Sequence, residues 1–262
     1  MIEFIEEIAF EAGRILSAHF RNIKSSDIKE KSKNEYVTMV DIKAEKLLRR
    51  RIQEKFPTHT IIGEEEGGIF NKHGFEWIID PLDGTHNFMH GFPMFCVSIA
   101  LAEDGIIKYG VIYDPIHEEM FKAEKGQGAF LNKKKISISK TNDLSRFFLA
   151  TGYPFRAKPY LELYLEAFKN LFLKTAGMRR AGSAALDLCY TACGRFDAFW
   201  EMKLKIWDIA AGALIIEEAG GKVSGFGKNK NFMETGCIIG SNGIFHEELQ
   251  NILETTFIEI DL

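Results

Sequence analysis

The chain has 262 residues, of which 46% are hydrophobic and 27% charged, and its net charge is −4. The length fits one large domain or two closely packed subdomains, and the composition excludes a disordered chain. The acidic balance argues against nucleic acid or an anionic membrane as the main partner, because both favour a basic surface.

Two amphipathic helices are predicted at the start of the chain. Residues 2–22 and 41–55 carry apolar side chains at helical spacing, and Pro57 ends the second segment. The polar stretch between them, Lys29–Tyr36, predicts an exposed, mobile loop. The acidic N-terminal segment lacks the basic and apolar regions of a secretory signal, and no apolar run approaches the roughly 20 residues that span a bilayer. We therefore expect a cytoplasmic protein without membrane contact.

The pattern changes to short β-branched and aromatic runs after the second helix. These runs, separated by Gly, Asp and Pro, predict an antiparallel meander to about residue 138. From Phe147 strands and helices alternate, which is typical of an α/β arrangement. We expect two parts packed as one unit: residues 1–140 with helices and a large antiparallel sheet, and residues 141–262 as a smaller α/β half. In the second part, helices are predicted over residues 159–173, 182–193, 207–219 and 243–253.

The segment WIIDPLDGTHNF, residues 77–88, is the most informative stretch for function. Pro and Gly favour a tight turn that holds Asp80 and Asp83 on one side. Two carboxylates aimed at one point repel each other unless a cation lies between them, and Mg²⁺ prefers such hard oxygen ligands. The N–H groups of Gly84 and Thr85 could receive a phosphate oxygen. The alternative is a plain Asp-Pro turn in which Asp caps the next element.

Three other acidic positions add to this motif. Glu64 lies in GEEEG directly after a predicted strand, and Asp208 begins the apolar helix that follows Trp207. Asp41 begins the second helix. The alternatives are a solvated acidic loop for the glutamates and a helix N-cap for each aspartate. An N-cap Asp can also direct its second oxygen at a metal, so the two interpretations are compatible.

Taken together, GEEEG, WIIDPLDGTHNF, GSAALDLCYTACGRFDAFWE and WDIAAGALIIEEAGG resemble the inositol monophosphatase family. The resemblance runs from about Phe4 to Leu253. It implies a layered αβαβα sandwich and a Mg²⁺-dependent, lithium-sensitive phosphatase that hydrolyses inositol 1-phosphate. Members of the family are usually homodimers, and the apolar stretch 147–155 could serve such an interface.

The same resemblance implies a site with two to three Mg²⁺ ions. Asp80 is expected to bridge two of them. Glu64 and the backbone carbonyl of Leu82 would complete the ligands of the first ion, Asp83 and Asp208 would hold the second, and a third, weaker ion is expected near Glu64.

Catalytic and substrate-contacting residues also follow from the resemblance. Thr85 and Asp41 match the pair that orients and deprotonates the attacking water, and Glu64 is counted with them as catalytic. Glu201 matches the residue that accepts hydrogen bonds from inositol hydroxyls, against the alternative of a surface carboxylate at a strand end. The implied substrate contacts are Asp83, Gly84, Thr85, Gly182, Ser183, Ala184, Glu201 and Asp208.

Two positions and two alternative functions remain open. Lys31 matches a basic residue on the family's mobile loop but is equally a solvated lysine. His86 departs from the small residue common in the family, and we expect a structural role for it. A broader sugar phosphatase that also cleaves fructose 1,6-bisphosphate is the enzymatic alternative, whereas GSAALD and FWE disfavour a 3′-phosphoadenosine nucleotide phosphatase. The alternative of another class is a scaffold or regulatory protein that binds a macromolecular partner. Against it, every side chain expected to bind a metal is present as a carboxylate.

Overall fold

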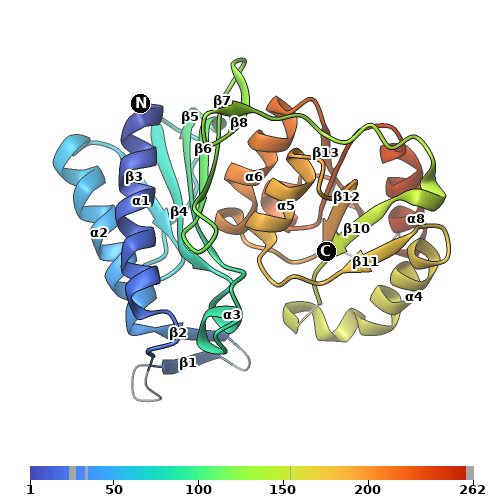
Figure 1. The fold of residues 1–262 in the computed structure, drawn as a ribbon, viewed down its shortest axis with the longest axis horizontal. Helices are drawn as coiled ribbons and strands as arrows, with labels where there is room; N and C mark the ends of the chain where they lie inside the picture. Colours follow the sequence, from blue (N-terminus) through green and yellow to red (C-terminus); the bar gives the residue numbers. More distant parts are fainter. Residues whose placement is uncertain (24–27, 33–34, 154, 258–262) are drawn as a thin grey trace.

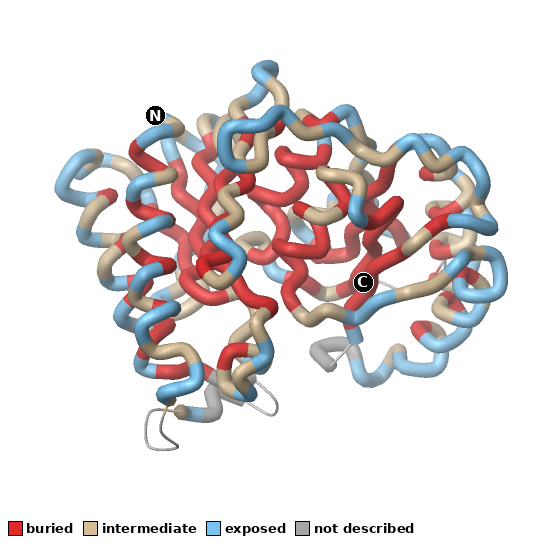
Figure 2. Tube along the Cα trace, in the orientation of Figure 1, coloured by how far each residue is buried: buried red, intermediate tan, exposed pale blue. Residues whose placement is uncertain are grey.

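The protein folds into five layers in the order helices, sheet, helices, sheet, helices (Figure 1). The computed structural model describes residues 1–23, 28–32, 35–153 and 155–257. The predicted αβαβα sandwich is confirmed. Figure 2 shows that the buried residues follow the two sheets and the central helices, while the outer faces of the flanking helices are exposed.

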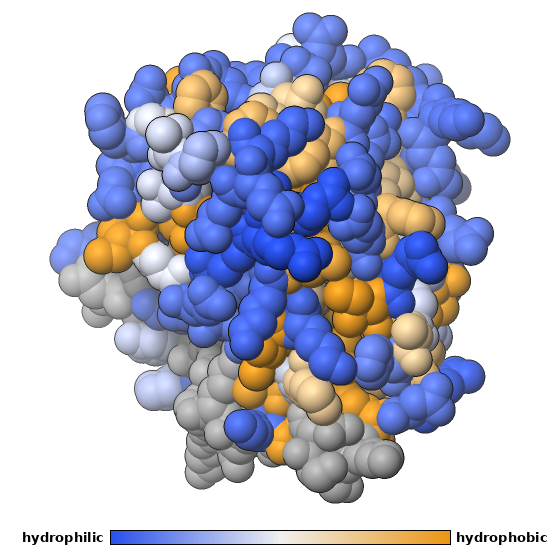
Figure 3. Space-filling model, turned by 90° about the vertical axis from the view of Figure 1, so that its left-hand side faces the viewer, coloured by the Kyte–Doolittle hydropathy of each residue, from blue (hydrophilic) through white to orange (hydrophobic). Residues whose placement is uncertain are grey.

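Helices α1 (Ile2–His19) and α2 (Met39–Lys55) form the outer layer on one side. The apolar stripe of α1 packs with α2 against the first sheet, and helix α2 begins at a capping box in which the Thr38 hydroxyl accepts from the Asp41 N–H. The face of the molecule on this side carries mainly hydrophilic side chains (Figure 3). None of the helices in the described residues is long and apolar enough to cross a membrane.

The polar stretch between these helices is not the loop that its composition predicts. Strands β1 (Ile28–Ser32) and β2 (Glu35–Thr38) pair antiparallel, with Ile28 opposite Thr38 and Lys29 opposite Val37. The prediction was wrong because main-chain hydrogen bonds, which do not depend on apolar side chains, connect these two segments. Lys31 lies in β1, and its side chain falls outside the described residues.

The first sheet has seven strands in sequential order from β3 to β9. All neighbours pair antiparallel except β3 and β4, which run parallel. The predicted meander is therefore correct from β4 onwards and wrong for β3. The strands are β3 (Thr60–Gly63), β4 (Phe75–Asp83), β5 (Cys96–Glu103), β6 (Ile106–Asp114), β7 (Glu119–Glu124), β8 (Gly128–Leu131) and β9 (Lys134–Lys135).

The parallel pair has a direct consequence for the position of Glu64. Gly63, the last residue of β3, lies opposite Ile79 of β4. Parallel strands end at the same edge of a sheet. Glu64, which follows Gly63, and Asp80, which follows Ile79, therefore lie at the same edge on neighbouring strands. An antiparallel β3 would have sent Glu64 to the opposite edge.

The second sheet has five strands in the order β11, β10, β12, β14, β13. Helices α4 (Leu161–Phe172) and α8 (His246–Phe257) cover its outer face, in agreement with the helices predicted there to within a few residues at each end. The remaining elements of this part are β10 (Phe148–Thr151), β11 (Gly177–Arg179), β12 (Ala198–Glu201), β13 (Lys222–Gly225), β14 (Ile238–Ser241), α7 (Phe232–Thr235) and the 3₁₀ turns Leu144–Arg146 and Phe155–Tyr160.

Helices α5 (Ala184–Ala192) and α6 (Ile206–Glu218) form the central layer between the two sheets. Every residue of α6 from Asp208 to Ile216 is buried, as expected for a helix that is apolar on all sides. Side chains of both helices share one core cluster with residues of both sheets, such as Ile112 and Ile238. The second part of the chain thus packs directly on the sheet of the first, and the division at residue 140 stays a prediction.

Candidate metal and active site

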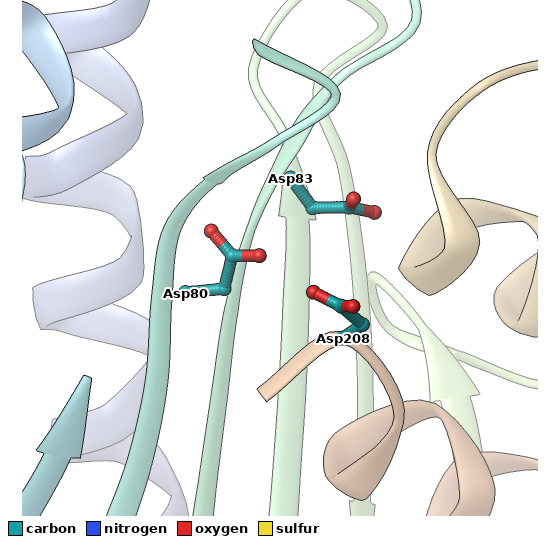
Figure 4. A group of neighbouring side chains, drawn as sticks. All are labelled: Asp80, Asp83 and Asp208. Carbon is teal, nitrogen blue, oxygen red and sulfur yellow. The ribbon is translucent and has the colours of Figure 1, made fainter. Parts of the chain in front are cut away.

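Three aspartate carboxylates converge where β4 ends and α6 begins. Asp80, Asp83 and Asp208 each offer an oxygen atom, and these atoms all lie within 4.8 Å of one another. In Figure 4 the three side chains point toward a common space between the sheet and the central helices. Residues more than a hundred positions apart in the sequence are therefore brought together as predicted.

The local structure of β4 explains why Asp80 and Asp83 face the same space. The pairing with β5 is interrupted between these two residues, so the chain bulges there. The backbone N–H of Leu82 donates to Asp80 Oδ1 at 2.9 Å, which fixes the bulge. Gly84 follows with φ of 93°, and a Cβ atom there would lie 2.7 Å from the Met94 carbonyl oxygen. Only glycine fits this position, and helix α3 (Thr85–Met89) begins directly after it.

Asp83 makes contacts well beyond the local Asp-Pro turn that was the alternative interpretation of the motif. Its Oδ2 accepts a hydrogen bond from the Ser183 hydroxyl at 2.6 Å and one from the Ala185 N–H at 2.8 Å. Ser183 is the N-cap of α5, and its hydroxyl also accepts from the Leu186 N–H. Asp83 thus connects β4 to the first turn of a helix a hundred residues later.

Asp208 and Asp41, for which a helix N-cap was the alternative interpretation, each lie three residues after the N-cap of their helix. Asp208 is the third residue of α6 and accepts from the N–H of the N-cap Lys205 at 2.8 Å. Asp41 holds the same place in α2 and accepts from the Thr38 N–H at 2.9 Å and from the Thr38 hydroxyl. The sequence does not distinguish the two places, because a carboxylate at either one satisfies N–H groups of a helix start.

One pocket collects nearly all of the residues singled out in the sequence. Apart from Asp41, every predicted catalytic, metal-ligating or substrate-contacting residue lines it. His86, for which we expected a structural role, lines it as well. The lining residues are Glu64, Asp80, Leu82, Asp83, Gly84, Thr85, His86, Gly152, Arg180, Gly182, Ser183, Ala184, Asp187, Glu201, Leu204 and Asp208.

Asp41 lies behind the pocket wall rather than in it. The side chain is fully buried, and the Thr85 hydroxyl oxygen lies 3.3 Å from Asp41 Oδ1 and 3.1 Å from the Leu82 carbonyl oxygen. Burial raises the pKa of Asp41 to about 6, although the hydrogen bonds from Thr38 act in the opposite direction. Thr85 therefore separates a buried carboxyl of raised pKa from the pocket.

The site concentrates negatively charged carboxylates in a small space. Burial raises the pKa of Asp80 well above its usual range, and the neighbouring carboxylates of Glu64, Asp83 and Asp208 raise it further. Bound cations would remove this repulsion. A donor set of carboxylate and carbonyl oxygens fits Mg²⁺, which is held by few protein oxygens and shares substrate phosphate.

Sequence reasoning missed two charged residues of the pocket, Arg180 and Asp187. Asp187 is buried in α5, and its Oδ1 has no hydrogen-bond partner among the described residues. Its pKa is raised well above the usual range, first by burial and then by Glu201 and Asp83. A single acidic residue inside the apolar helix GSAALDLCYTA was the signal that could have found it.

Gly152 shows how closely Glu201 is held at the pocket wall. Glu201 ends β12 and is only 8% exposed, which rules out the surface carboxylate considered from the sequence. A Cβ atom at Gly152 would lie 2.0 Å from the Glu201 carboxyl carbon. The glycine at the end of the neighbouring β10 thus makes room for the carboxylate.

Comparisons with known proteins agree with this fold. The model of the inositol monophosphatase family matches residues 1–256. The chain is 43% identical over 248 residues to Nus factor SuhB of Pseudomonas aeruginosa, covering 92% of this chain and 91% of that protein.

Two solved structures are similar over almost their whole length. The extragenic suppressor protein suhB from Bartonella henselae superposes with a TM-score of 0.89 at 39% identity, covering 96% of this chain and 97% of that one. Inositol monophosphatase from Anabaena superposes with a TM-score of 0.86 at 37% identity, covering 97% and 95%. The layered fold is thus that of a phosphatase family. The chain belongs to the inositol monophosphatase family.

Proposed function

We propose that this protein is a Mg²⁺-dependent phosphatase that hydrolyses myo-inositol 1-phosphate to inositol and phosphate. The observation that carries the proposal is the convergence of Asp80, Asp83 and Asp208 in a pocket that Glu64 and Glu201 also line. Family membership supports the reaction class, and the similarity to the Anabaena inositol monophosphatase supports the substrate.

The residues proposed to hold Mg²⁺ are divided between two positions. Glu64, Asp80 and the Leu82 carbonyl would serve one ion, and Asp80, Asp83 and Asp208 would serve the other, with a third ion near Glu64. When bound, such ions neutralise charge on the phosphate and lower the pKa of a water molecule, so that the water loses a proton more readily and becomes a better nucleophile.

Thr85 and Asp41 are proposed to orient and deprotonate the attacking water. Thr85 lines the pocket, and its hydroxyl oxygen lies 3.3 Å from Asp41 Oδ1. As the Thr85 oxygen accepts a proton from the water, the Thr85 hydroxyl donates its own proton to Asp41 Oδ1. Because the pKa of Asp41 is about 6, the group is ionised at neutral pH and able to accept this proton.

The substrate's polyol is proposed to lie against the other wall of the pocket. Glu201 would accept hydrogen bonds from two hydroxyl groups, and the backbone of Gly84 and Gly182–Ala184 would border the ligand. Ser183 already gives its hydroxyl proton to Asp83, so its contribution is to hold that carboxylate. Arg180, which also lines this wall, adds a positive charge suited to an anionic substrate.

A phosphate-release panel tests the proposal. The wild type is assayed with Mg²⁺, with and without EDTA, on inositol 1-phosphate, fructose 1,6-bisphosphate and 3′-phosphoadenosine nucleotides, with Asp80→Asn as the inactive control. We expect the highest kcat/KM on inositol 1-phosphate, complete loss in EDTA and inhibition by millimolar lithium. A higher kcat/KM on fructose 1,6-bisphosphate would favour the broader sugar phosphatase instead, and release that persists in EDTA would refute the metal-dependent reaction.

A second candidate function is the binding of a macromolecular partner. The name Nus factor SuhB, carried by curated relatives of up to 43% identity, favours it. Complementation separates the two candidates: the wild type and Asp80→Asn are expressed in Pseudomonas aeruginosa lacking its own SuhB. Equal complementation by both would show a role without catalysis, complementation by the wild type alone would tie the role to the site, and complementation by neither would overturn this candidate.

We also propose a cytoplasmic homodimer. In the stretch 147–155, Phe147, Leu149 and Ala150 are buried inside the second sheet, while Tyr153 is exposed. Helix α4 also exposes apolar side chains, those of Leu161, Leu165 and Phe172. Sedimentation equilibrium of the wild type and of Leu165→Glu would test this, with dimer expected for the first and monomer for the second; a monomeric wild type would refute it.

A further inference from the structure

The loop that carries Glu64 is closed at both ends by its own backbone. Gly63 N–H donates to the Gly67 carbonyl at 3.1 Å, and Gly67 N–H donates to the Gly63 carbonyl at 3.0 Å. Glu64 and its two glutamate neighbours are enclosed between these residues. The backbone N–H groups inside such a loop need acceptors from elsewhere in the protein.

Glu45 of helix α2 supplies those acceptors. Its side chain is only 1% exposed, and its Oε2 accepts from the Glu65 N–H at 2.8 Å while its Oε1 accepts from the Glu66 N–H at 3.0 Å. One buried carboxylate therefore binds the two residues that directly follow Glu64. Hydrogen bonds from backbone N–H groups to a carboxylate are among the stronger ones in proteins.

Arg49, one turn further along α2, completes the arrangement. Its Nε donates to Glu45 Oε1 at 2.8 Å, and its Nη2 donates to the Gly67 carbonyl at 3.2 Å. The same guanidinium lies 3.3 Å from the Glu66 carboxylate. The two side chains together contact the middle and the end of the loop.

Gly63 shows how closely the helix approaches the loop. A Cβ atom at this residue would lie 2.5 Å from Glu45 Oε1 and 2.9 Å from Arg49 Nη2. The glycine is thus needed for the approach of these side chains and not for a left-handed backbone, because its φ is not positive.

A simple stabilising ion pair does not account for these contacts. An i,i+4 pair on a helix surface contributes only about 0.3–0.5 kcal/mol, and a buried pair loses much of its attraction to desolvation. Here the carboxylate is aimed at two N–H groups beside Glu64. Helix α2 also carries Asp41 one turn before Glu45, so one rigid element fixes both the buried carboxyl behind Thr85 and the loop of Glu64.

We propose that Glu45, together with Arg49, is a positioning residue that holds the Gly63–Gly67 loop and so keeps Glu64 at the edge of the metal site. The inference rests on the proposed function, because it takes Glu64 as a Mg²⁺ ligand. Residues that orient a metal ligand without touching the metal commonly change metal affinity by about 10–100-fold when replaced.

The test compares Glu45→Gln with Glu54→Gln in the full chain. Glu54 is a matched control because it lies on the same helix and pairs with Arg50 at the same i,i+4 spacing, but is exposed and remote from the loop. Mg²⁺ affinity is measured by titration calorimetry, and phosphate release is measured as a function of Mg²⁺. For Glu45→Gln we expect a Kd for Mg²⁺ raised about 10–100-fold and a kcat restored by excess Mg²⁺. Glu54→Gln should match the wild type.

Two outcomes overturn the inference: an Mg²⁺ Kd within twofold of the wild type, or a fall in kcat that excess Mg²⁺ does not restore. If Glu45→Gln does not fold, Glu45→Asp, which keeps the charge but has a shorter reach, is judged by the same two criteria. Hydrogen exchange at the Glu65 and Glu66 amides, measured without metal, should be faster in the Glu45 variant and unchanged in Glu54→Gln. A wild type that binds Mg²⁺ without releasing phosphate would refute the proposed function alone, while normal Mg²⁺ binding by an active Glu45 variant would refute the positioning role alone.

Discussion

Asp41 combines complete burial with a hydrogen-bonded place at the start of α2. Its pKa of about 6 lies above the ordinary value of 3.8, so between these pH values the folded protein keeps a proton that the unfolded chain has lost. The free energy of unfolding contributed by this group therefore falls as pH rises through that window. The same shift places the change from acid to base close to neutral pH, where a proton acceptor for Thr85 is useful.

Replacing Asp41 by Asn should remove this pH dependence. In EDTA, the stability of Asp41→Asn relative to the wild type should increase by up to about 3 kcal/mol between pH 4 and pH 8, since each pKa unit corresponds to about 1.36 kcal/mol. Urea unfolding at the two pH values measures the difference, with exposed Glu54→Gln as the control that should show none. An equal difference at both pH values would mean that the pKa of Asp41 is the same in the folded and the unfolded protein.

Thr85 is the residue between this carboxyl and the pocket. Thr85→Ala should lower kcat by about 100-fold or more and change KM little, because a group that moves a proton acts in the transition state. Thr85→Ser keeps the hydroxyl and should retain most of the activity. Steady-state kinetics on inositol 1-phosphate measure both variants. A raised KM at unchanged kcat would assign Thr85 to substrate binding.

At the scale of elements, the first turn of α5 connects helix stability to the site. The Ser183 hydroxyl accepts from the Leu186 N–H at 3.3 Å and donates to Asp83 Oδ2 at 2.6 Å. One side chain thus caps the helix and orients a proposed metal ligand. The helix start and the end of β4 are held together by this bond and by the one from Ala185.

Ser183→Ala should therefore have two effects. Loss of the cap should lower the free energy of unfolding by about 0.5–2 kcal/mol, and the loosened Asp83 should weaken Mg²⁺ binding. Ser183→Thr, which keeps a hydroxyl, should show a smaller loss of both stability and Mg²⁺ affinity. Urea unfolding and titration calorimetry measure the two quantities separately. Lower stability with unchanged Mg²⁺ affinity would limit Ser183 to capping.

At the scale of the whole molecule, the site lies between layers. Asp80 and Asp83 belong to the first sheet and Asp208 to the central helices, so cations held by all three would connect these layers. Without cations, burial raises the pKa of Asp80, and the repulsion between the neighbouring carboxylates raises it further. Metal binding and folding are coupled in such an arrangement.

Mg²⁺ should accordingly raise the Tm of the wild type and leave that of Asp80→Asn nearly unchanged. A ligand at 100 times its Kd stabilises the folded state by about 2.7 kcal/mol. In EDTA at pH 8 the Tm of Asp80→Asn should be higher than that of the wild type, because the amide carries no charge to be buried. Differential scanning calorimetry with and without Mg²⁺ measures both. A wild-type Tm that does not respond to Mg²⁺ would contradict the metal site.

Much of the fold could be predicted because its signals are local. Helical spacing marked α1, α2 and α6, and strand patterns marked β4 to β8, since both depend on neighbours a few residues apart. The antiparallel pair of β1 and β2 was not predicted, because its pairing does not depend on apolar side chains. The direction of β3 was predicted wrongly, because composition carries no information about strand direction.

The sequence by itself determined the layered architecture and the acidic residues of the site, because turn-forming residues, spacing and family motifs are written along the chain. Only the tertiary structure decided how these residues are supported: Glu64 beside Asp80 through parallel pairing, Asp83 bound to the start of α5, and Asp187 and Arg180 in the pocket wall. Each of these contacts joins segments far apart in sequence. Their geometry depends on how all layers pack at once, which no local pattern contains.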